Sequence, residues 1–142
     1  MLQKFFFNLY TALIGLFDKG KPRLVDLAFY RESIFNPVGL WTLVAAAGLA
    51  MIFYFMVNGK DTAAYLREYG PSRPKWLLTL LLAAGTGAWL AYYIGLRLGA
   101  LPELFFRYFI IVNALVAMLW FGLASLLAKL RWFSSNARST PF

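Results

Sequence analysis

The sequence predicts an all-α membrane protein with three transmembrane helices, preceded by one or two amphipathic helices at the membrane interface. Three apolar runs predict the spans at about 38–57, 76–96 and 104–128. At 1.5 Å per residue, each run is long enough to cross a hydrocarbon core of about 30 Å. Apolar residues make up 61% of the chain and are gathered in these runs, which distinguishes a membrane protein from a soluble protein with an apolar core.

Residues 2–17 predict an amphipathic helix. A helix of this length would rise about 24 Å, which is short for a span. We therefore favour a helix that lies at the interface over a fourth, short or tilted span. The polar or small residues recur every three or four positions and form one narrow stripe: Lys4, Asn8, Thr11 and Gly15. The rest of the circumference is apolar, and we expect three membrane anchors in it: Phe5, Phe6 and Phe7.

A second amphipathic helix is predicted over residues 22–35, where polar side chains recur at helical spacing beside an apolar face. The pair Asn36–Pro37 then predicts a helix start, because Asn caps free backbone N–H groups and Pro fits the first helical position. The uncharged run 38–57 follows as the first span. We expect three regions in the chain: an amphipathic interfacial segment (1–36), a transmembrane domain (37–132) and a mobile tail (133–142).

The second span has a small-residue middle that predicts close packing against another helix. Small side chains let two helix backbones approach closely in a membrane, where lipid tails are as apolar as the side chains. We expect this packing role for six residues: Ala83, Gly87, Ala91, Ala84 and Ala88 in the second span, and Gly48 in the first. The short connection 97–103 predicts that the second and third spans are antiparallel neighbours.

Positive charges and tryptophans mark the expected interfaces. The chain has 14 Lys and Arg against 6 acids, and beside apolar spans this predicts contact with the anionic headgroups of the lipid bilayer rather than with nucleic acid. Trp41, Trp76 and Trp132 are expected to anchor span ends, where aromatic residues gather. We expect Arg107 to extend from the third span to the interface. The alternative is an electropositive mouth formed by Arg107 and Arg97.

Asn113 is the most polar side chain deep inside a predicted span. An amide in hydrocarbon is costly unless it is hydrogen-bonded, so it should face protein or water. One interpretation is a tie between helices, made to a backbone carbonyl or to Thr86. The other is a ring of Asn113 side chains around a symmetry axis, which would line a pore. We favour the tie, because intramembrane amides serve structure more often than transport.

The residue types argue against an enzyme. The chain has no Cys and no His, which removes thiol nucleophiles, a histidine base and the common ligands of zinc and haem. All six acids lie outside the predicted spans and lack the close pairing that metal-assisted hydrolysis would use. We therefore expect no catalytic site, no cofactor and no metal.

Function is expected at the level of an assembly. Three spans bury little surface alone, so we expect copies of the chain or other membrane subunits as partners. Polar and small residues inside the spans, without functional acids, favour a homo-oligomeric channel or pore-forming subunit. The alternative is a non-catalytic accessory or anchoring subunit of a larger membrane complex, and a holin-like permeabilising protein is a third hypothesis. Compactness and short loops favour the bacterial inner membrane.

Overall fold

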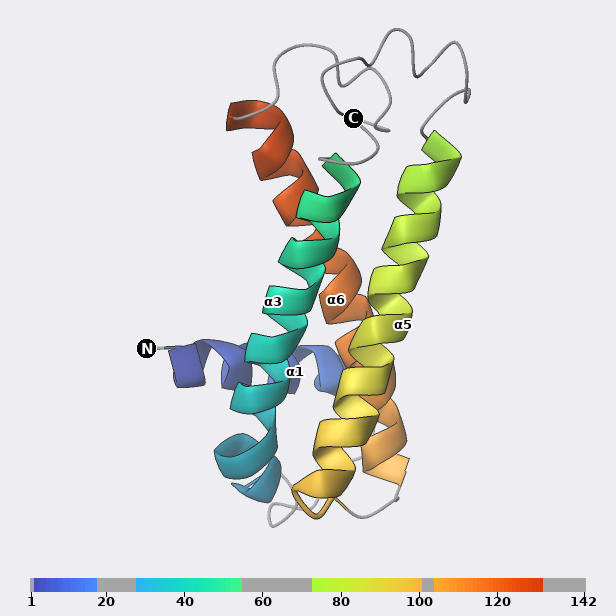
Figure 1. Ribbon diagram of the computed structural model, residues 1–142. Helices are drawn as coiled ribbons and strands as arrows, with labels where there is room; N and C mark the ends of the chain where they lie inside the picture. Colours follow the sequence, from blue (N-terminus) through green and yellow to red (C-terminus); the bar gives the residue numbers. More distant parts are fainter. Residues whose placement is uncertain (1, 18–27, 55–72, 101–103, 132–142) are drawn as a thin grey trace, which may run out of the picture.

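The computed structural model describes residues 2–17, 28–54, 73–100 and 104–131 (Figure 1). The elements in chain order are α1 (Leu2–Phe17), the π-helical turn η1 (Tyr30–Ile34), α3 (Phe35–Ile52), α5 (Arg73–Arg97) and α6 (Leu104–Arg131). Within these four segments the backbone is helical apart from the turn at 98–100, and there is no strand. The all-α class is thereby confirmed for the described residues.

Three helices are long and apolar enough to cross a membrane. They are Tyr30–Ile52, Pro74–Arg97 and Phe105–Leu127, of 23, 24 and 23 residues. All three pack against one another, and α5 runs opposite to α3 and α6 (Figure 1). We call the end that carries η1 and the turn between α5 and α6 the lower end of the bundle, and the opposite end the upper end.

The first span begins earlier than the sequence predicts. The Asn36–Pro37 pair predicts a helix start, whereas the helix continues without a break from residue 28 to residue 54. Pro37 lacks an N–H group, and its ring clashes with the carbonyl four residues back in a regular α-helix. The π turn accommodates this ring, because the Phe35 N–H donates to the Tyr30 carbonyl, five residues back, just before Pro37. Residues 22–27 of the expected second amphipathic helix lie outside the described segments.

Helix α1 crosses the bundle instead of running alongside the spans, and it passes behind α3 in Figure 1. It packs on α3 and α6. Three residues spaced four apart form its buried face: Phe6, Tyr10 and Ile14. Lys4 and Asn8 of the polar stripe are exposed on another side of the helix. The amphipathic pattern of α1 therefore separates a face that packs on the spans from exposed polar positions at Lys4 and Asn8, while Thr11 of the stripe is half-buried.

Two clusters of buried apolar residues fill the bundle. The lower cluster is rich in aromatic rings from α1, η1, α3 and α6, among them Tyr10, Tyr30, Phe35, Phe106 and Phe109. The upper cluster joins α3, α5 and α6 and includes Phe53, Tyr54, Trp76 and Phe121. The three spans are thus held by apolar packing along their length, and α1 is part of the lower cluster.

Candidate functional site: a polar centre that joins four helices

Among the described residues, three polar side chains are buried: Thr42, Asn113 and Ser125. Asn113 on α6 is fully inaccessible and lies eight residues above Phe105, where the third span begins. At 1.5 Å per residue this is about 12 Å inside the span, where the amide depends on the protein for its hydrogen bonds. The contacts of Asn113 define the candidate site.

The Asn113 amide forms hydrogen bonds with three other helices. Its Nδ2 donates to the Gly87 carbonyl oxygen on α5 at 2.7 Å and to Thr42 Oγ1 on α3 at 2.9 Å. Its Oδ1 accepts a hydrogen bond from the Tyr10 hydroxyl on α1, and the Thr42 hydroxyl donates to the same oxygen at 3.3 Å. Both N–H groups and the oxygen of the amide are therefore used within one chain. We call these four residues the Asn113 centre.

A close approach of α5 to α6 makes the bond to Gly87 possible. A Cβ atom at Gly87 would lie 2.5 Å from the Ala117 Cβ and 2.9 Å from the Asn113 carbonyl oxygen. Any side chain here would push the helices apart and stretch the bond to the amide. Ala83 and Ala91, four residues to either side of Gly87, are also buried. The expected packing face of α5 thus contains the residue that supplies a backbone acceptor to the centre.

Tyr10 links the centre to α1. Its ring stacks on Phe35 at a centroid distance of 5.0 Å and lies 5.3 Å from the Phe109 ring. These two rings fix the direction in which the hydroxyl points. Burial raises the pKa of the Tyr10 phenol above its ordinary value of 10.0, so the hydroxyl keeps its proton at neutral pH and remains a donor to Asn113.

Phe6 and Gly39 form a second contact that seats α1. The nearest Phe6 ring carbon lies 2.5 Å from the position that a Gly39 Cβ would take, so the ring packs directly on the α3 backbone. Phe6 precedes Tyr10 by four residues on the same buried face. Two contacts therefore hold α1 in place: the Phe6 ring packs on Gly39, and the Tyr10 hydroxyl donates a hydrogen bond to Asn113.

The structure separates the remaining expected packing and polar residues from the centre. The Thr86 hydroxyl donates to the Leu82 carbonyl within α5 at 2.8 Å and does not contact Asn113. Ala84 and Ala88 are half-buried beside the buried face of α5. Gly48 is half-buried on α3, and no atom lies within 4 Å of the position of an added Cβ. Among the residues that the structure describes, Gly48 is thus not a point of close approach to another helix.

The three phenylalanines of α1 have different surroundings. Phe6 is buried on α3, as described above. Phe5 is 47% exposed, and its ring lies 6.0 Å from the Trp120 ring on α6. Phe7 is half-buried, and the Arg31 guanidinium carbon lies 4.4 Å from its ring centroid. Only part of this expected anchor group is therefore available to lipid.

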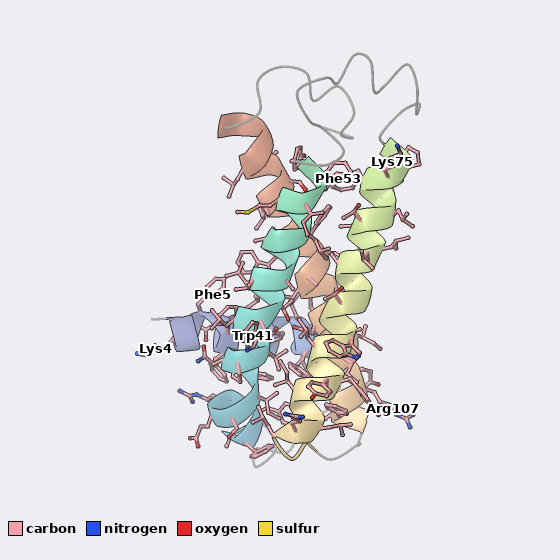
Figure 2. The ribbon with its side chains drawn as sticks, viewed as in Figure 1. Lys4, Phe5, Trp41, Phe53, Lys75 and Arg107 are labelled. Atoms are coloured by element: carbon pink, nitrogen blue, oxygen red, sulfur yellow. The ribbon has the colours of Figure 1, made fainter. Side chains whose placement is uncertain are left out.

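The expected tryptophan and arginine positions are spread over the bundle. Trp41 is exposed on α3 near the height of α1 (Figure 2). Trp76 is buried at the upper end, and its Nε1 donates to Ser125 Oγ at 3.3 Å. Trp132 lies outside the described residues. Arg107 is exposed at the lower end of α6 (Figure 2), and the exposed Arg97 places its guanidinium 4.9 Å from the Tyr93 ring centroid: these are the two residues of the expected mouth.

The Asn113 centre can hold helices together, but it offers no reactive group. It contains an amide, two hydroxyls and a backbone carbonyl, none of which changes charge near neutral pH. Over the segments that the structure describes, no three His, Cys, Asp or Glu residues are grouped so that they could hold a metal ion. The chemistry of the centre is that of directional hydrogen bonds in a dry interior.

Sequence reasoning identifies Asn113 and Gly87 but not their partners. Thr42 carries a hydroxyl group within the apolar run of the first span, and this polar group could have indicated a hydrogen-bond partner for Asn113. Nothing in the sequence distinguishes Tyr10 from the other aromatic residues of α1, because its role depends on how α1 crosses the spans.

Comparisons of the chain with protein-family models, with curated proteins and with solved structures found no match.

Proposed function

We propose that this protein is an integral membrane protein without a catalytic site, which serves as an accessory or anchoring subunit of a larger membrane assembly. Three apolar helices of spanning length support the membrane location. The observation that carries the rest is the Asn113 centre, in which the amide uses both N–H groups and its oxygen on α1, α3 and α5. An amide used in this way has little hydrogen-bonding capacity left for ions or water.

A homo-oligomeric channel receives less support from this geometry. An amide that lines a pore faces the axis and exchanges hydrogen bonds with passing solutes, whereas Asn113 is completely buried within one chain. The hydroxyls of Thr79 and Thr86 donate to carbonyls of their own helix. The described spans therefore offer little polar surface from which a pore could be built.

The outward face of α5 is the proposed contact with other subunits. α5 is the least buried of the three spans. Large apolar and aromatic side chains are exposed along it, and the intervals between them are four, seven, three and four residues: Leu78, Leu82, Trp89, Tyr92 and Leu96. Gly85 divides the interval of seven into three and four residues. The six positions then alternate between spacings of four and three, which is the pattern of helices that pack along one another. The proposal assigns this face to a helix of a partner subunit.

Ion flux through the purified protein in liposomes tests this proposal against a channel. An accessory subunit should leave the flux of potassium and chloride at the level of protein-free vesicles. Flux that requires the protein, and that changes in size or selectivity when Asn113 is replaced by Leu, would establish a channel and overturn the proposal.

The partner contact is tested by the mass of particles extracted directly from the native membrane into nanodiscs. We expect a particle heavier than the 16.1 kDa chain that contains another membrane protein. Gly85→Leu should dissociate it, because the new side chain projects from the proposed contact face. Gly48→Leu, a matched change at an open position on α3, should leave it intact. A particle that holds this chain alone would contradict the accessory role.

A further inference from the structure

Helix α1 lies deep within the height of the spans. Phe6 of α1 packs on Gly39, which is nine residues above Tyr30, where the first span begins. At 1.5 Å per residue this contact is about 14 Å from the lower end of the span. The part of α3 between Gly39 and Ile52, about 20 Å long, lies above it.

The contact of α1 with α6 gives the same depth independently. Tyr10 donates to Asn113, which is about 12 Å above the start of the third span at Phe105. Figure 1 shows α1 crossing the bundle at this level, well above the turn that joins α5 to α6. In a bilayer that covers all three spans, α1 is therefore surrounded by acyl chains and not by headgroups.

Polar groups nevertheless lie on and beside α1. Lys4 and Asn8 are exposed, one helical turn apart, and Lys4 is at the free end of α1 (Figure 2). Arg31, from η1 below, brings its guanidinium to 4.4 Å from the Phe7 ring centroid. Lys4 and Asn8 therefore place a cation and an amide at a depth where an unperturbed leaflet offers no water and no phosphate, whereas Arg31 reaches toward α1 from the lower end of the span.

The length of a side chain is too small to resolve this conflict. An extended lysine reaches about 6 Å from Cα to Nζ, which is about half of the depth of α1. Charged residues in membranes are accommodated by extension to the interface, by local thinning of the bilayer or by water defects. Since extension is too short for Lys4 here, the leaflet has to approach the helix.

We propose that α1 is a lipid-contact surface that thins the leaflet beside it. Phospholipid phosphates dip to the level of Lys4 and Asn8, while the exposed Phe5 and Leu16 contact the acyl chains. On the opposite side of the bundle, along α5, the leaflet keeps its full thickness. This inference rests on the membrane location proposed above and goes beyond the accessory role, because its partner is lipid.

Spin labels on the full chain test the inference, and the absence of Cys from the sequence means that no background substitution is needed. Asn8→Cys places one label on the polar stripe of α1. Gly85→Cys places the control on the exposed face of α5, two residues from Gly87 of the centre, where an added Cβ meets no atom within 4 Å. Both are measured in phosphatidylcholine vesicles that contain phosphatidylglycerol. Collisions of each label with a water-soluble nickel chelate and with oxygen report depth, and the distance between the two labels in a doubly labelled chain reports docking of α1.

Thinning predicts a nickel-to-oxygen collision ratio at residue 8 that exceeds the ratio at residue 85 by about fivefold or more, with the label distance of the docked structure. Equally low ratios with the docked distance would place α1 in an unthinned leaflet and overturn the inference. A longer, broad distance would place α1 on the membrane surface and overturn it as well. High ratios at both residues would mean that α5 faces water, and the proposed membrane location would fail together with the inference.

A charge substitution separates thinning from a general effect of positive charge. Lys4→Leu should lower the ratio at residue 8 by about twofold, because one of the groups that attracts phosphate is lost. Arg107→Leu removes an exposed cation at the lower end of α6 (Figure 2) and should leave the ratio unchanged. Equal effects of the two substitutions would contradict the inference.

Discussion

The hydrogen bond from Tyr10 to Asn113 predicts that the effect of Tyr10→Phe on the free energy of unfolding changes sign when Asn113 is also replaced. Tyr10→Phe removes the hydroxyl and keeps the ring that stacks on Phe35. In the native chain this loss should lower the free energy of unfolding by about 0.6–2 kcal/mol, the range for hydrogen bonds between helices in membranes. We expect the upper half of this range, because both side chains are fully buried.

Asn113→Leu should lower the free energy of unfolding further, by about 2–4 kcal/mol, because it removes every bond of the centre and leaves the Tyr10 hydroxyl buried without a partner. Thr42 recovers part of its own loss by turning its hydroxyl toward a carbonyl of α3. In the Asn113→Leu background, Tyr10→Phe should then be neutral or stabilise by up to about 1 kcal/mol, since it removes the unpaired hydroxyl. The effect of one substitution therefore changes sign with the other.

Unfolding by SDS in mixed micelles, followed by loss of helical circular dichroism, gives the four free energies of this cycle. Tyr92→Phe on α5 is the control, because it removes a hydroxyl from a side chain that is 52% exposed. Its effect should be within about 0.5 kcal/mol of zero in both backgrounds. An equal cost of Tyr10→Phe in both backgrounds would refute the hydrogen bond, and with it the reasoning that makes Asn113 a tie between helices.

Three further predictions use the same titration or the label distances. Gly87→Ala should lower the free energy of unfolding by about 1–3 kcal/mol, because its Cβ has no room against α6, whereas Gly85→Ala, at an open exposed position, should be neutral or stabilise by up to about 1 kcal/mol. Gly39→Ala should displace the phenylalanine ring that packs on it and lengthen the distance from α1 to α5, while Gly15→Ala on α1 itself should not. Because burial raises the pKa of the Tyr10 phenol above 10.0, the stability that its protonated form contributes is complete at neutral pH and decreases as the pH rises above about 10; release of α1 between pH 5 and 9 would contradict this.

The spans follow directly from the sequence, because their defining property is local. A run of about 20 apolar residues satisfies the length requirement whatever its neighbours are, and Pro74–Arg97 and Phe105–Leu127 agree with the predicted ranges within a few residues. The start at Tyr30 is the exception. Asn36 and Pro37 carry a strong local signal for a helix start, and the π turn before them allows the helix to continue.

The Asn113 centre is only half visible in the sequence. An amide in an apolar run indicates that the side chain needs hydrogen-bond partners, but it does not indicate which residues these partners are. Gly87 acts through its backbone carbonyl, which every residue possesses, and is recognisable only by the small size that permits close approach. Tyr10 belongs to the centre because α1 turns across the spans, and such an orientation is a tertiary property that no periodicity encodes.

The link between α1 and α6 also orders the biogenesis of the protein. Tyr10 and Asn113 are 103 residues apart, so a ribosome delivers the phenol long before the amide exists. Until α6 is present, the aromatic face of α1 has only the part of its binding surface that α3 provides. The hydrogen bond to Asn113 is therefore the closing step in the docking of α1, which can begin earlier on α3 through Phe6 and Gly39.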